Sequence, residues 1–93
     1  MKTRKQVLAE FQRMQNQLFG TFGYGAIEVR AYDQGNGYWS VTILVTRLND
    51  ETKKHDVWES VEWRNYGERL HGEDVEAENE AKLAEFKEKF NLK

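Results

Sequence analysis

The sequence contains no cysteine and no proline. Without cysteine, disulfide bonds and thiolate metal ligands are excluded, and the composition fits a reducing compartment. Without proline, no proline-rich linker divides the chain. Apolar runs such as Ile43–Val45 are far too short to span a bilayer, which takes about 20 residues. The basic start is not followed by an apolar segment, so we expect no secretion signal, no membrane contact and a cytoplasmic location.

The sequence also lacks a large excess of either positive or negative charge, because it has 14 Lys and Arg residues and 16 Asp and Glu residues and the net charge is −2. No overall field therefore draws the chain to nucleic acid or to a membrane. The charge is nevertheless segregated, since residues 1–25 are net positive and residues 67–93 are net negative. We expect these two ends to attract each other in one domain spanning residues 1–93.

Hydrophobic periodicity indicates five elements: helices over about residues 4–19 and 74–90, and strands over residues 26–32, 38–47 and 54–63. The first helix begins with a capping box formed by Thr3 and Gln6. Clusters of glycine, asparagine and aspartate separate the strands. The predicted fold class is α+β, in the order α-β-β-β-α: a three-stranded antiparallel meander with both helices packed on one face.

The alternation of apolar residues also predicts the pairing of the strands. Pairing Tyr32 with Tyr38 and Leu48 with Lys54 places the aliphatic residues of all three strands on one side, as the two-residue period of a strand requires. Glu59 is the exception, because this register places its carboxylate on the core side. We expect either a β-bulge that turns Glu59 outward or a base such as Arg13 that meets it.

The opposite side of the predicted sheet carries aromatic and apolar residues that the fold does not require. Leu44 is expected beside Trp58 at one end and Tyr32 beside Tyr38 at the other, with polar residues between them. Such residues are enriched at the centres of protein interfaces, although cross-strand aromatic pairs also stabilise sheets without any partner. The candidate partner-binding residues are Tyr32, Tyr38, Leu44, Trp58, Arg30 and Glu62. We therefore expect a non-catalytic domain that binds a protein partner or a second copy of itself.

The remaining motifs point to no cofactor, metal or catalytic group. The glycines of residues 20–25 follow a helix and precede a strand, the reverse of a phosphate-binding loop. His71 stands beside Glu73 and Asp74, but these two acids suit a helix start, and no metal-binding spacing exists.

Nucleic-acid binding is an alternative, because the element order resembles that of the double-stranded RNA-binding domain. That resemblance implies contacts through the start of the second helix, which is acidic here, from Glu73 to Glu76, and would repel phosphate. This alternative therefore uses the first helix and the Lys53-Lys54 loop. A further alternative is an inhibitory or accessory protein of a phage or mobile element.

Overall fold

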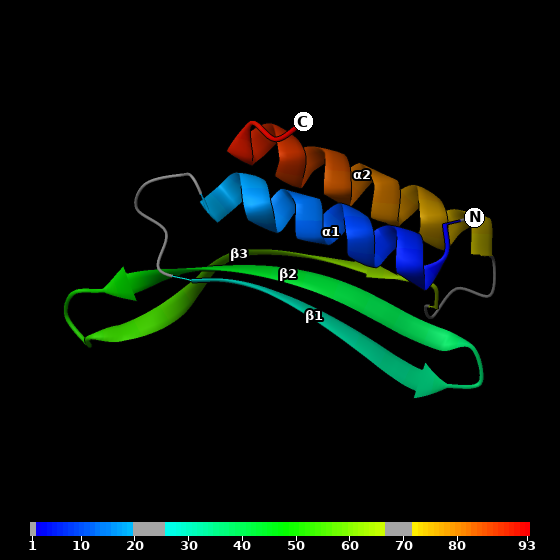
Figure 1. The fold of residues 1–93 in the computed structure, drawn as a ribbon, viewed down its shortest axis with the longest axis horizontal. Coiled ribbons are helices and arrows are strands. Elements are labelled where there is room, and N and C mark those ends of the chain that lie inside the picture. The colour runs from blue at the N-terminus through cyan, green and yellow to red at the C-terminus, as the bar shows by residue number, and fades with distance from the viewer. Residues whose placement is uncertain (1, 20–25, 67–71) are drawn as a thin grey trace.

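The computed structural model describes residues 2–19, 26–66 and 72–93, and its elements follow the predicted order. They are α1 (Arg4–Phe19), β1 (Ala26–Gly35), β2 (Tyr38–Asn49), β3 (Lys54–Arg64) and α2 (Gly72–Phe90). The strands form one antiparallel sheet in the order β1-β2-β3, and both helices lie on one of its faces (Figure 1). The α+β meander predicted from the sequence is thus confirmed. The glycine-rich connection and His71 lie outside the described residues.

The core lies between the two helices and the central strand. From α1 the stripe at three- and four-residue spacing is buried, and from β2 every second residue between Val41 and Val45 is buried, as amphipathic elements of a two-layer domain require. The most deeply buried apolar side chains are Val7, Phe11, Met14, Leu18, Val41, Ile43 and Val45. Within the described part of the chain, no helix is both long and apolar enough to cross a membrane.

The register between β1 and β2 differs from the predicted register by two residues. Tyr32 pairs with Ser40 instead of Tyr38, and Ile27 pairs with Val45. The two-residue turn of Asn36 and Gly37, both at positive φ, would shift the pairing by three residues, and a β-bulge between Asp33 and Gly35 reduces the shift to two. A two-residue loop with positive φ at both positions matches the twist of a hairpin. A shift of two residues leaves every side chain on its predicted face.

A β-bulge interrupts the pairing of β3 with β2, and it changes the face of the sheet on which the neighbouring residues lie. Val45 pairs with Glu59 while the next residue, Thr46, pairs with Val57, so Trp58 is the extra residue. An extra residue on one strand reverses the alternation beyond it. Val57 therefore faces away from the helices, which corrects its predicted place in the core opposite Val45.

Glu59 stays on the helix-covered face, and an ion pair with Lys89 of α2 compensates its charge. The bulge predicted near this position is present, but it does not turn Glu59 outward. The compensating base also comes from α2 instead of α1, where Arg13 is exposed. Alternation alone places the carboxylate of Glu59 in the core. In the structure it is only half-buried, and its pairing with Lys89 offsets the cost of removing the charge from water.

Candidate functional site

The face of the sheet opposite the helices, called the outer face here, is not covered by any described element (Figure 1). Four of its side chains are large, apolar or aromatic, and exposed: Tyr32 at 44%, Tyr38 at 52%, Leu48 at 52% and Val57 at 60%. In the observed register, this face is formed by Glu28, Arg30, Tyr32, Tyr38, Ser40, Thr42, Leu44, Thr46, Leu48, His55, Val57, Ser60, Glu62 and Arg64. An uncovered face with several large apolar side chains is typical of an interaction site.

Three tyrosines gather at one end of the outer face, and we call Tyr32, Tyr38 and Tyr66 the tyrosine anchor. The rings of Tyr38 and Tyr66 are tilted at 52°, with centroids 5.9 Å apart. Gln34 donates a hydrogen bond to the hydroxyl of Tyr66. Tyr66 lies two residues beyond the end of β3, and it is absent from the predicted site because no strand period extends to that position.

The row of Tyr32 is closely packed even though it faces away from the helices. Ser40 pairs with Tyr32 on one side and Arg64 on the other, and only 1% of Ser40 is exposed. The short side chain of Ser40 is therefore shielded from water although it faces away from the helices, whereas Tyr32 beside it is exposed.

The opposite end of the outer face carries an aliphatic anchor formed by Leu44, Leu48 and Val57. Leu44 is half-buried and pairs with Ser60, whereas Leu48 pairs with His55 and Val57 with Thr46. Leu48 is absent from the predicted site because β2 was predicted to end at Arg47. Val57 is absent because alternation without a bulge at Trp58 places it in the core. Continued alternation through Leu48 was the signal available for the former.

A polar row of Arg30, Thr42 and Glu62 crosses the three strands between the two anchors. Arg30 donates from Nε and Nη2 to Glu28 Oε2, at 3.0 and 2.6 Å. Hydrogen bonds with Tyr32 and Glu28 raise the pKa of the Arg30 guanidinium, which is therefore charged at any physiological pH. Among the described residues, no base forms an ion pair with Glu62. The row thus has the guanidinium of the Arg30–Glu28 ion pair at its β1 end and the Glu62 carboxylate at its β3 end.

The structure corrects the predicted position of Trp58, which does not lie on the outer face beside Leu44. The bulge turns Trp58 toward the helices, where its ring meets Phe90 edge-on at 5.6 Å. Arg47 lies over the same ring, 4.5 Å from its centroid. Trp58 therefore packs against the end of α2. The other five predicted partner-binding residues share the outer face.

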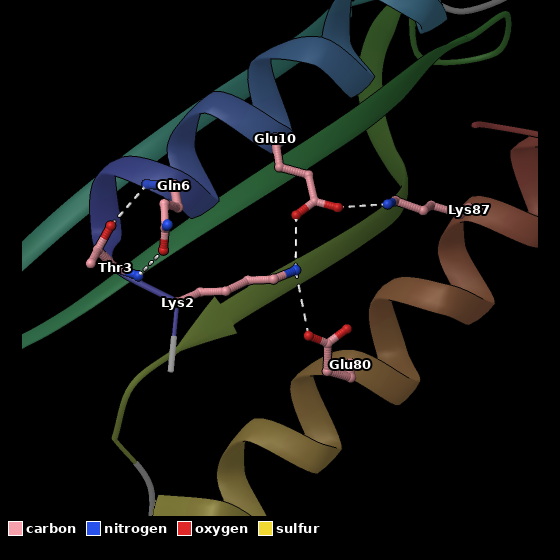
Figure 2. A network of polar contacts seen from close by, with 6 residues as sticks. All are labelled: Lys2, Thr3, Gln6, Glu10, Glu80 and Lys87. Carbon is pink, nitrogen blue, oxygen red and sulfur yellow. Dashed lines mark hydrogen bonds and ion pairs between the residues drawn. The ribbon is translucent and has the colours of Figure 1, made fainter.

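A polar cluster joins the two helices on the opposite side of the molecule (Figure 2). Glu10 of α1 accepts hydrogen bonds from Lys87 at 2.6 Å and from Lys2 at 3.1 Å, and Lys2 also approaches Glu80 at 3.4 Å. Burial raises the pKa of Glu10, but the two lysines outweigh that effect and hold the pKa below its ordinary value. Every carboxylate in the cluster meets a lysine, so the arrangement is that of a structural link between helices.

An open groove of about 390 Å³ runs between β3 and α2 beside the Glu59–Lys89 pair. Acids and bases alternate along its lining, where Lys82 and Glu85 join that pair. The described residues include no group of three or more His, Asp or Glu side chains that could hold a metal ion. The groove therefore presents a mixed, solvated surface instead of a ligand pocket with convergent groups.

The residues of the nucleic-acid alternative lie apart from the outer face. Lys53 and Lys54 are exposed at the turn between β2 and β3. Before and at the start of α1, Lys2 is engaged by Glu10 and Arg4 forms an ion pair with Asp33 at 3.3 Å, whereas Lys5 and Arg13 have no ion pair among the described residues. Bases that already have acidic partners attract phosphate less strongly, because the neighbouring acid cancels much of their field.

In comparisons with known proteins, no family model, no curated protein and no solved structure matches this chain. The interpretation of the outer face therefore rests on its own geometry and chemistry.

Proposed function

We propose that this chain is a non-catalytic binding domain that contacts another protein chain through the outer face of its sheet. The observation that carries the proposal is the uncovered outer face, with Tyr32, Tyr38, Leu48 and Val57 between 44 and 60% exposed. Removing large apolar side chains from water is the main favourable term in most protein associations. The fold does not need these side chains for its core, which lies on the other side of the sheet.

The chemistry of the outer face favours protein over nucleic acid as the partner. On this face Glu28 and Glu62 balance the charges of Arg30 and Arg64, so the face offers a polyphosphate backbone no net positive charge. Tyrosines and aliphatic residues around a polar row resemble the composition of protein interfaces, where aromatic residues and arginine are enriched. The two anchors supply buried area, and the polar row supplies orientation.

A photo-crosslinking amino acid placed at Thr42, the centre of the outer face, tests this proposal in the intact chain in cells. The control is the same group at Gln12, an exposed position of α1. We expect a defined adduct from Thr42 and none from Gln12. The captured chain, once purified, should bind the wild type at least about tenfold more tightly than the Leu48→Ser/Val57→Ser variant. Equal adducts from both positions, or none from Thr42, would refute the proposal.

A further inference from the structure

The outer face is complementary to itself, and this points to the identity of the partner. Resting on the proposed function above, we propose that the occupant of the outer face is a second copy of this chain. The two sheets pack face to face around a twofold axis that lies between them and runs parallel to β2. Such an isologous arrangement, in which both copies use the same patch, is the commonest form of protein assembly.

The charged residues of the polar row favour this axis. A twofold axis parallel to β2 lays β1 of each copy over β3 of the other, at the same height along the strands. Arg30 and Glu62 occupy opposite ends of one row, with Thr42 between them. Arg30 of each copy therefore meets Glu62 of the other, which produces two opposite-charge contacts. A guanidinium has five N–H donors, so Arg30 can keep Glu28 and still donate to a second carboxylate.

The neighbouring rows are compatible with the same axis. Tyr32 and Arg64 share a row, so the ring on one copy meets the guanidinium on the other, a favourable cation–π combination. Ala26 and Val57 share another row, so the small side chain of one copy lies over the larger one of the other. The anchor residues of the central strand β2, which are Tyr38, Leu44 and Leu48, each meet their own equivalents across the axis.

An axis perpendicular to the strands satisfies these groups less well. It places β3 over β3, and when both anchors are covered Glu62 faces Ser60 of the other copy. The carboxylate would then be removed from water without a base, which costs more than the contact returns. The parallel axis is the arrangement in which both anchors are covered and Glu62 gains a positive partner.

The size of the face sets the expected affinity. Three strands of 10 to 12 residues make a face about 33 Å long and about 14 Å wide. Two such faces bury on the order of 1,000 Å² in total, at the low end of specific interfaces. We therefore expect a reversible dimer with a dissociation constant in the micromolar range.

Charge reversal tests both the partner and the axis. In Arg30→Glu, two carboxylates face each other at each contact, and in Glu62→Arg two guanidinium groups do. Each variant alone should dimerise at least about tenfold more weakly than the wild type by sedimentation equilibrium. An equimolar mixture of the two should recover wild-type affinity as a heterodimer, because every contact then joins opposite charges. Thermal unfolding at low concentration, where the chain is monomeric, checks that each variant folds.

The possible outcomes separate this inference from the function on which it rests. A wild-type chain that stays monomeric at high micromolar concentration overturns the inference, as does a mixture that fails to restore association. If the Thr42 crosslinker then captures a different protein, the proposed function stands without self-association. If it captures nothing, both proposals fall. Dimerisation with rescue in the mixture supports the second copy and the parallel axis together.

Discussion

At the scale of single residues, Asn79 shows how one buried amide ends an element. Its Nδ2 donates to the carbonyl of Arg64 at 2.6 Å, and its Oδ1 accepts from the Arg64 N–H at 3.4 Å. These are the backbone groups at the last residue of β3, an edge strand with no further strand to pair them. The periodicity of α2 suggests an apolar residue at this position, but the end of the strand requires an amide.

We expect Asn79→Ala to lower the free energy of unfolding by about 2 kcal/mol, because it leaves a partly buried N–H and C=O without partners. Urea unfolding followed by tryptophan fluorescence measures the change. Asn16→Ala, on the exposed side of α1, is the matched control and should be neutral or slightly stabilising, because alanine favours helix more than asparagine does. Equal effects at both positions would show that the amide bridge contributes nothing.

At the scale of elements, the β-bulge in β3 decides which of two adjacent residues faces the helices. Uninterrupted alternation places Val57 on the core side and Trp58 on the outer face, whereas in the structure Val57 is on the outer face and the partly exposed Trp58 packs against Phe90 of α2. Bulges are common at sheet edges, and β3 is an edge strand. The bulge gives the outer face an aliphatic end and gives the end of α2 an aromatic neighbour.

These two neighbours should therefore respond differently to truncation. Trp58→Ala should destabilise the fold by about 1–2 kcal/mol, less than for a fully buried tryptophan because 38% of Trp58 is exposed. It should leave association unchanged. Val57→Ala should change stability by less than about 0.5 kcal/mol and weaken association. Chemical denaturation measures the stability of both variants, and sedimentation equilibrium measures their association. A large loss of stability in Val57→Ala together with weaker association in Trp58→Ala would contradict the observed bulge.

At the scale of the whole molecule, the attraction predicted between the two chain ends is only part of the pattern. Lys2 does approach Glu80 of α2, but the shortest contact runs the other way, from Lys87 near the C-terminus to Glu10 of α1. Gln17 completes the link, because its side chain bonds to the backbone N–H and C=O of Lys93. The helices are thus joined at several points above the sheet.

The lowered pKa of Glu10 predicts a pH dependence of stability. A carboxyl group whose pKa is lower in the folded state stabilises the fold above its ordinary pKa, and that contribution is lost as the pH falls through the folded value. Glu10→Gln should therefore cost about 1 kcal/mol at neutral pH. The difference from wild type should shrink toward zero below about pH 4.

Urea unfolding across this pH range measures the effect. Glu88→Gln, an exposed position of α2, serves as the control and should show little change at any pH. A Glu10→Gln penalty that stays constant from neutral to acid pH would mean that its charge does not contribute to the link.

The sequence predicted most of the local structure, including the capping box. Thr3 and Gln6 exchange hydrogen bonds at 2.9 and 3.2 Å, as their spacing indicates (Figure 2). Element order and type, and the face of nearly every strand residue, followed from periodicity, because burial on one side imposes it. Five of the six predicted site residues lie on the predicted face, because their position depends only on the alternation of side chains along a strand.

What remained undetermined was the geometry that depends on contacts between distant segments. A two-residue turn and a bulge each shift the pairing without changing the residue types, so the sequence alone did not reveal the register or the place of Trp58. The base that meets Glu59 depends on how α2 docks, and the bridging role of Asn79 depends on where β3 ends. The sequence by itself determined the elements and their faces, because both are local. Only the tertiary structure decided the register and the partners of the buried polar groups, because these are set by packing across the chain.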